Sequence, residues 1–291
     1  MRGRWLVTGA SGQLGGSIAE LTEPLGYDWV YPTRMEMDLS DPSSMITAMN
    51  AYRPSGVINC AAYTAVDKAE VEPELAFVIN AIAPKILAEE CAKLGIPIVQ
   101  VSTDYVFDGS KPEPYVEDDP IGPLGVYGAS KEQGETAVRL SGAQHAIIRT
   151  AWLLNPTGSN FLTTMLRLGE DRDQLRIVSD QTGCPTSVKD LAKALILIAQ
   201  QLGNKSGTWH FVNSGSATWY ELAAHIFKQV GQHKGHVPIL TPISTLEYPT
   251  AAQRPANSML STAKLEADFG IRPRSWQHAI DSILTEVLQP V

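Results

Sequence analysis

A glycine-rich segment near the start of the chain constrains its fold more than any other feature. Residues 8–15 read TGASGQLG and directly follow a short apolar strand pattern. Because glycine has no Cβ atom, Gly9 can make a tight turn, Gly12 lets the backbone approach a pyrophosphate, and Gly15 lets a helix pack closely on the strand. The N–H groups at the start of a helix over 13–23 complete a phosphate cradle. The segment therefore predicts a dinucleotide-binding strand–turn–helix unit.

Strand and helix patterns alternate along the first half of the chain. Strands are expected near 4–8, 28–32, 56–61, 97–103 and 145–150, and helices near 13–23, 41–52, 73–94 and 124–141. This alternation predicts an α/β fold: a doubly wound, parallel Rossmann sheet with helices on both faces.

The pattern becomes less regular after residue 152, where loops are rich in Pro, Gly and Thr. These loops predict a smaller, discontinuous C-terminal substrate-binding lobe. The nucleotide-binding domain is expected at 1–151, with 187–233 returning to it through helices near 187–202 and 217–231 and a strand near 208–212. The substrate-binding lobe is expected at 152–186 and 234–291.

A second motif, Tyr127-Gly128-Ala129-Ser130-Lys131, indicates the chemistry. Residues four apart on a helix share a face, so the Lys131 ammonium can lie near the Tyr127 phenol. Lowering a tyrosine pKa from about 10 by roughly three units takes about 4 kcal/mol, which Lys131 and an oxidised nicotinamide can supply together. Thr103 ends an apolar strand, at the edge where ligands bind in open α/β sheets. Each feature alone also fits a surface pair or a backbone-bonded hydroxyl, so the interpretation depends on their combination.

The glycine fingerprint, the strand-end Thr103 and the Tyr-x-x-x-Lys motif, in this order, resemble the extended branch of the short-chain dehydrogenase/reductase superfamily. Further segments are similar to the dTDP-4-dehydrorhamnose reductase family and follow its order over almost the whole chain: 59–70, 102–109, 149–152, 160–161 and 254–258. The resemblance implies reduction of the C4 keto group of dTDP-4-dehydro-L-rhamnose to dTDP-L-rhamnose by NAD(P)H.

The resemblance also implies roles for single residues. In the catalytic set, Tyr127 protonates the carbonyl oxygen, Thr103 donates a second hydrogen bond to it, Lys131 holds the nicotinamide ribose and Asn80 orders the site. The expected cofactor-binding residues also include Gly9, Ser11, Gly12, Gln13, Leu14, Gly15, Ala61, Ala62 and Tyr63. The expected substrate-binding residues are Thr103, Asp104, Tyr105, Trp152, Asn160 and Arg254. Trp152 fits a partly buried aromatic residue at a lobe junction equally well.

The choice of cofactor depends on the residues after the second strand, which read Tyr31-Pro32-Thr33-Arg34. A carboxylate at this point binds the ribose hydroxyls of NAD, whereas an arginine can neutralise the 2′-phosphate of NADP. Arg34 therefore favours NADPH, with NADH as the alternative. Asp38 and Leu39 resemble the pair that family members place near the adenine.

Composition excludes several classes of function. The 291 residues are 44% hydrophobic and 19% charged, as in a soluble globular protein, and the net charge of −8 argues against nucleic acid as a partner. No apolar run is long enough to span a bilayer and no signal peptide pattern precedes the first strand, so we expect a cytoplasmic protein without a membrane partner. Cys60, Cys91 and Cys184 lie far apart, which predicts free thiols and no metal site.

Magnesium and a homodimer are left open by the sequence. Some family members bridge a dimer with magnesium through glutamates, but the corresponding helix start reads Ser187-Val188-Lys189-Asp190, without a matching acid set. The acidic run 117–119 is interpreted as a solvated loop.

Two alternatives to the reductase remain at this point. One is a non-catalytic, NADP-binding regulatory subunit similar to that of methionine adenosyltransferase. The other is a reductase or epimerase that acts on a different nucleotide sugar.

Overall fold

The computed structural model describes residues 3–23, 28–234 and 237–288, so the outer limits of the expected domains at residues 1–2 and 289–291 lie outside it. Its centre is a six-stranded sheet in the order β10-β5-β4-β3-β1-β2, and every neighbouring pair is parallel. The strands are β1 (Trp5–Thr8), β2 (Trp29–Val30), β3 (Gly56–Asn59), β4 (Ile98–Thr103), β5 (His145–Thr150) and β10 (Gly207–His210).

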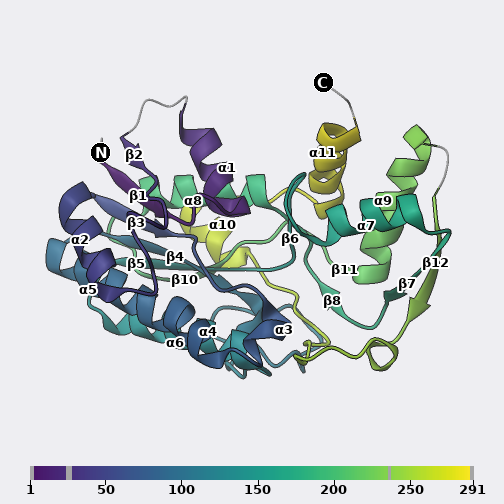
Figure 1. Cartoon of the computed structure of the whole chain (residues 1–291), viewed down its shortest axis with the longest axis horizontal. Helices are drawn as coiled ribbons and strands as arrows, with labels where there is room; N and C mark the ends of the chain where they lie inside the picture. Colours follow the sequence, from purple (N-terminus) through teal and green to yellow (C-terminus); the bar gives the residue numbers. More distant parts are fainter. Residues whose placement is uncertain (1–2, 24–27, 235–236, 289–291) are drawn as a thin grey trace.

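Helices cover both faces of this sheet (Figure 1). One face packs against α1 (Gln13–Thr22), α8 (Val188–Gln201) and α10 (Ala263–Phe269), and the other against α2 (Pro42–Tyr52), α5 (Ala83–Leu94) and α6 (Val126–Leu140). Because both faces are buried, β3 and β4 are buried along their whole length. The predicted doubly wound fold is confirmed.

The long helical pattern over 73–94 is built from three parts. These are α4 (Pro73–Phe77), a π-helical turn η2 (Val78–Ile82) and α5, preceded by the short α3 (Val66–Ala69). A π-helical turn inside an α-helix re-aims side chains and is frequent at functional sites. Here it contains Asn80, a predicted site residue.

A separate apolar cluster lies at the other end of the molecule (Figure 1). It joins α7 (Phe161–Asp171), α9 (Trp219–Lys234) and α11 (Trp276–Leu288) with the parallel pair β7 (Gln174–Val178) and β12 (Ile239–Ile243). Short connecting elements are β6 (Leu153–Leu154), β8 (Thr182–Gly183), β9 (Thr186–Ser187), β11 (Ala217–Thr218), η3 (Asp104–Val106) and η4 (Thr245–Glu247). Among the described residues, no helix is long and apolar enough to cross a membrane.

This packing differs from the expected domain boundaries at two helices. Segment 187–233 was assigned to the nucleotide-binding domain, and α8 and β10 do join the central sheet. However, α9 packs on α11 and β7 in the separate cluster, whereas α10 packs on β10. Apolar faces decide this, because Leu222, Ile226 and Phe227 on α9 bury against the small cluster. We propose a second lobe that includes α9 and leaves out α10.

Gly15 allows α1 to approach β1, and its replacement tests the cradle. A Cβ atom at Gly15 would stand 2.3 Å from the Gly9 carbonyl oxygen, which forces the helix away from the turn. We expect Gly15→Ala to lower the free energy of unfolding by about 1–3 kcal/mol and to weaken NADPH binding, as measured by denaturant titration and fluorescence.

The neighbouring Gly16→Ala is the control, since its Cβ would meet its nearest atom, the Ala10 carbonyl oxygen, at 3.3 Å. Equal behaviour of the two variants would contradict the proposed tight contact.

Candidate active site

The turn after β1 has the geometry of a phosphate cradle. Gly9 adopts a positive φ of 73° and a Cβ there would stand 2.9 Å from the backbone nitrogen of Ala61. The Gly12 N–H donates to the Gly9 carbonyl at 2.9 Å, and no side chain among the described residues caps α1 at Gly12. The N–H groups of the first helical turn are therefore available to an anion. A dinucleotide pyrophosphate fits this turn.

The other predicted residues of this turn differ in their surroundings. Ser11 is exposed, whereas the Leu14 side chain is buried in the core below α1. Gln13 reaches toward the second lobe, where its Nε2 donates to the Ser159 carbonyl at 3.3 Å and its Oε1 accepts from Asn160 at 3.2 Å. The start of α1 is thus tied to the segment between β6 and α7.

A row of buried polar side chains crosses the carboxyl ends of the strands. Thr8 on β1 donates to the Asn59 side chain on β3, and Asn59 donates to Gln100 on β4 at 2.8 Å. Thr8 also accepts a hydrogen bond from the Ala61 N–H at 3.2 Å, which sets the path of the loop after β3. Asn59 was not predicted as a site residue, because its side-chain contacts depend on strand order.

Asn80 holds that loop against α6. Its Oδ1 accepts from the Tyr63 N–H at 2.8 Å, and its Nδ2 donates to the Tyr63 carbonyl and to the Ser130 hydroxyl, both at 3.0 Å. Ser130 in turn donates to the Tyr127 carbonyl at 2.8 Å. Asn80 therefore brings the predicted cofactor loop 61–63 and the Tyr127 helix into one unit, whereas the Tyr63 hydroxyl points to Glu72.

The structure brings Thr103 and Tyr127 together. The Tyr127 hydroxyl lies close enough to the Thr103 side chain for that hydroxyl to lower the pKa of Tyr127. Thr103 Oγ1 donates to Asp104 Oδ1 at 2.9 Å and accepts from the Tyr105 N–H at 3.2 Å. Burial raises the pKa of Tyr127 to about 12, and the Asp104 charge adds to the increase. In the protein alone, the pKa of Tyr127 is therefore raised and not lowered as expected.

Asp104 is a buried carboxyl group beside this pair. Burial raises its pKa to about 6, against the lowering effect of its hydrogen bond with Thr103. Since Thr103 has a single proton and gives it to Asp104, its hydroxyl must turn before it can donate to a substrate oxygen.

Lys131 is more deeply buried than a lysine in a solvated Tyr–Lys surface pair would be. Its Nζ donates to the Val101 carbonyl on β4 at 2.7 Å, and its side chain is 4% exposed. Burial lowers the pKa of Lys131 to about 8, while the Glu135 carboxylate raises it. The ammonium is thus held against the backbone of β4.

The residues after β2 are placed as a cofactor-selecting loop requires. The Arg34 side chain is 82% exposed, and its Nε lies 3.6 Å from Asp38 Oδ2. Asp38 Oδ1 accepts from the Ser40 N–H and hydroxyl at 2.9 and 2.7 Å, and these hydrogen bonds lower its pKa. Leu39 is buried in the core below α2. An exposed guanidinium fits a 2′-phosphate at this position.

Arg254 of the second half lies over Tyr105 of the first. Its guanidinium carbon is 6.0 Å from the Tyr105 ring centre, and the Tyr105 ring meets the Tyr127 ring edge-on at 5.6 Å. Arg254 Nη2 lies 2.7 Å from the Asp67 carboxylate on α3. Asp67 was not predicted, because no local pattern links it to a residue almost two hundred positions away.

Trp152 and Asn160 have structural partners. Trp152 has a positive φ of 44° and stacks on Trp219 with ring centres 3.4 Å apart. This contact fits the alternative in which Trp152 is a partly buried aromatic residue at the junction of the two lobes. A role for Trp152 in stacking on the sugar stays a prediction. Asn160 caps α7 by accepting from the Thr163 N–H at 3.1 Å, and its Nδ2 donates to the Asn155 carbonyl at 2.9 Å. It reaches the cradle through Gln13.

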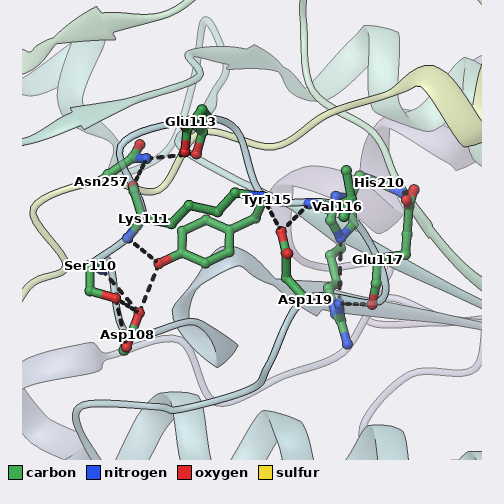
Figure 2. Close-up of polar contacts among 11 residues, drawn as sticks. Asp108, Ser110, Lys111, Glu113, Tyr115, Val116, Glu117, Asp119, His210 and Asn257 are labelled. Atoms are coloured by element: carbon green, nitrogen blue, oxygen red, sulfur yellow. Dashed lines mark hydrogen bonds and ion pairs between the residues drawn. The ribbon is translucent and has the colours of Figure 1, made fainter.

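The loop 108–119 is a polar network (Figure 2). The Tyr115 hydroxyl donates to Asp108 at 2.8 Å, and the Lys111 ammonium lies 2.6 Å from Asp119. Glu117 accepts from the His210 N–H at 3.0 Å, and burial raises its pKa. The interpretation of 117–119 as a solvated loop is therefore wrong for Glu117, which is partly buried against β10. Asp119 remains partly exposed and pairs within the loop.

Asn257 fastens the Arg254 loop to this network. Its Nδ2 donates to the Glu113 carbonyl at 3.1 Å and also to the Lys111 carbonyl (Figure 2). Gly109, with a positive φ of 75°, packs directly on Pro255. Within the described part of the chain, no group of three or more His, Cys, Asp or Glu side chains could hold a metal ion.

This fold and this site place the chain in the short-chain dehydrogenase/reductase class. A family model described as the RmlD substrate binding domain matches residues 3–289. A dTDP-4-dehydrorhamnose reductase of Sinorhizobium fredii is 40% identical over 290 residues, which cover 98% of each chain. The chain belongs to the dTDP-4-dehydrorhamnose reductase family.

Other similar proteins agree with this family. The spore coat polysaccharide biosynthesis protein SpsK of Bacillus subtilis is 41% identical over 281 residues, covering 97% of this chain and 96% of that protein. The crystal structure of a dTDP-4-dehydrorhamnose reductase from Bacillus anthracis in complex with NADP is 37% identical, with a TM-score of 0.93 and coverage of 98% of this chain and 100% of that one.

Asn80 can be tested as the residue that orders the site. Asn80→Ala leaves the partly buried Tyr63 N–H and carbonyl without their side-chain partner, which costs about 1–3 kcal/mol of unfolding free energy. We expect that loss in denaturant titration, together with weaker NADPH binding.

Asn50 on the exposed side of α2 provides the matched control, and Asn50→Ala should change stability by less than about 0.5 kcal/mol. An Asn80→Ala protein as stable as the control would remove the ordering role.

Proposed function

We propose that the chain reduces the C4 keto group of dTDP-4-dehydro-L-rhamnose to dTDP-L-rhamnose with NADPH, and with NADH as a second donor. The main support is the proximity of Tyr127 to Thr103, which ends β4 at the carboxyl edge of the sheet. It lies at the edge where the glycine cradle begins, as a dinucleotide-dependent reaction requires. Relatives that carry this enzyme's name match nearly the whole chain.

In this proposal, the bound dinucleotide supplies the hydride to C4. Tyr127 gives its proton to the carbonyl oxygen as negative charge develops there, which is worth about 10²- to 10⁴-fold in rate. Thr103 turns from Asp104 toward the same oxygen and donates a hydrogen bond. A phenol with a raised pKa holds its proton until this moment. We propose that the Lys131 ammonium, one helical turn away, stabilises the phenolate that remains.

Lys131 and Arg34 are assigned to the cofactor. Lys131 binds the nicotinamide ribose, and Arg34 neutralises the 2′-phosphate. Asp38 accepts from the adenine, while backbone groups of the cradle and of loop 61–63 position the pyrophosphate and the nicotinamide.

Arg254 and Tyr105 are assigned to the substrate. Arg254 exchanges Asp67 for the diphosphate, which can accept two parallel hydrogen bonds from a guanidinium. Because Asp67 belongs to α3 and Arg254 to the loop after β12, this exchange occurs where the two halves of the chain meet. Tyr105 supplies an aromatic face beside Tyr127.

We also propose that the protein is located in the cytoplasm. Cys60, Cys91 and Cys184 are free thiols, which supports a cytoplasmic location. A homodimer stays a prediction, and so does any role for magnesium.

The reaction is tested by generating dTDP-4-dehydro-L-rhamnose in the presence of the purified protein and NADPH. Oxidation of NADPH, with dTDP-L-rhamnose identified by NMR, is the expected result. A different reduced sugar would move the protein to another nucleotide sugar, and no oxidation of NADPH or NADH would favour the non-catalytic binding subunit.

Tyr127→Phe removes the proposed acid and keeps the ring. We expect kcat to fall by about 10²-fold or more, with NADPH affinity changed little. Tyr220→Phe on α9, which removes a hydroxyl in the separate apolar cluster of the second lobe, should keep full activity. Undiminished turnover by the Tyr127 variant would exclude it from the mechanism.

Arg34→Ala tests the choice of cofactor. Loss of an exposed charge–phosphate contact should weaken NADPH binding by about 10-fold, or roughly 1.4 kcal/mol, and leave NADH binding unchanged. The exposed Arg53→Ala at the end of α2 is the control. An equal loss of affinity for both cofactors would contradict the 2′-phosphate assignment.

A further inference from the structure

A chain of buried charges lies behind Lys131. Glu135 follows one turn later on α6, and Arg149 comes from β5. Glu135 and Arg149 are each 1% exposed. Arg149 Nε donates to Glu135 Oε1 at 2.9 Å and Nη2 donates to Oε2 at 2.8 Å, which makes a two-pronged ion pair inside the protein. Three charged side chains thus share one dry region.

Stability alone does not account for this arrangement. Removing charges from water is costly, and apolar side chains of similar size are often as stabilising as a buried ion pair. Lys131 itself is anchored by one neutral acceptor, the Val101 carbonyl. Its charge therefore depends on the carboxylate one turn away.

The other polar groups around Lys131, Glu135 and Arg149 are either neutral or have a weaker electrostatic effect on these three residues. The Cys60 thiol lies beside Lys131, and burial raises the pKa of that thiol to about 12. The Ser102 hydroxyl is buried without a hydrogen-bond partner among the described residues. Arg139 Nη1, from a partly exposed side chain on α6, lies 3.0 Å from the Glu135 carboxylate.

Around Arg149, the guanidinium donates to the Glu117 carbonyl at 3.1 Å and lies 5.0 Å from the Phe107 ring centre. Burial and the Arg149 charge lower the pKa of His210 to about 3, so this histidine is neutral. Among the described residues, Glu135 therefore provides the negative charge that acts on Lys131.

We propose that Glu135 is a positioning residue that keeps the Lys131 ammonium charged for the cofactor, and that Arg149 limits how strongly it does so. This inference rests on the proposed function, because it takes Lys131 as a cofactor ligand. Burial lowers the pKa of Lys131 and Glu135 raises it, so without Glu135 the ammonium loses its proton closer to neutral pH. Cofactor affinity then declines at a lower pH.

Two variants should move this decline in opposite directions. In Glu135→Gln the positive Arg149 remains and the carboxylate is lost, so the pH at which NADPH affinity halves should fall by about one unit or more. Above that pH, binding weakens by about tenfold. In Arg149→Met the carboxylate loses its buried partner and keeps only the partly exposed Arg139, so it acts more strongly on Lys131 and the midpoint should rise. Fluorescence titration with NADPH across alkaline pH measures both midpoints without turnover.

The double variant Glu135→Gln/Arg149→Met provides a measurement that does not depend on the folding of the single variants, each of which leaves one charge of the buried pair without its partner. The double variant removes both charges of the Glu135–Arg149 pair. The pH at which its NADPH affinity halves should lie between the values for Glu135→Gln and the parent protein. Glu132→Gln makes the same charge change on the same helix, at a side chain that is 30% exposed, and should leave the midpoint unchanged.

An unmoved midpoint in Glu135→Gln, or a shift of both single variants in the same direction, would overturn the inference. A purely structural role would weaken binding at every pH instead. Lys131→Met distinguishes the proposed role of Lys131 in cofactor binding from the proposed effect of Glu135 on Lys131. If it abolishes the pH dependence while Glu135→Gln does not move the midpoint, only this inference fails, whereas unchanged binding by Lys131→Met overturns the proposed role of Lys131 as well.

Discussion

The close approach of two backbone turns at the carboxyl ends of β1 and β3 is the constraint on which the site depends. Gly9 lies against Ala61 at a distance that excludes a side chain, and its left-handed conformation turns the chain into α1. Thr8 then fixes the loop after β3 through the Ala61 N–H. This contact leaves the start of α1 open to an anion and places loop 61–63 beside it, so cradle and loop form a single surface.

Burial is the second physical principle of the site. Tyr127, Asp104 and Lys131 all lie in surroundings that penalise their charged forms, and the pKa of each moves toward its neutral form. Two of them are held by specific hydrogen bonds: Asp104 accepts from Thr103, and Lys131 donates to the Val101 carbonyl. A site of this kind keeps its protons in place until a substrate or cofactor brings a new charge.

The two halves of the chain are joined through the site itself. Gln13 and Asn160 link the cradle to the start of α7, and Asp67 and Arg254 link α3 to the loop after β12. Asn257 and the network around Tyr115 hold that loop from the other side. Substrate and cofactor residues are therefore connected by hydrogen bonds that cross between sequence-distant segments, and a ligand that replaces one partner acts on both halves.

The sequence by itself determined the doubly wound sheet, the glycine turn and the family, because these depend on local periodicity and on residue types at fixed spacing. It also singled out Thr103, Tyr127, Lys131 and Asn80, which the structure gathers at one edge, although their roles stay predictions. Only the tertiary structure decided which distant side chains became partners. Asp67 pairs with Arg254, Arg149 with Glu135, and Trp152 with Trp219. It also decided the packing of α9 and the burial of Glu117, because burial and pairing follow from which strands and helices become neighbours, and no local pattern contains that information.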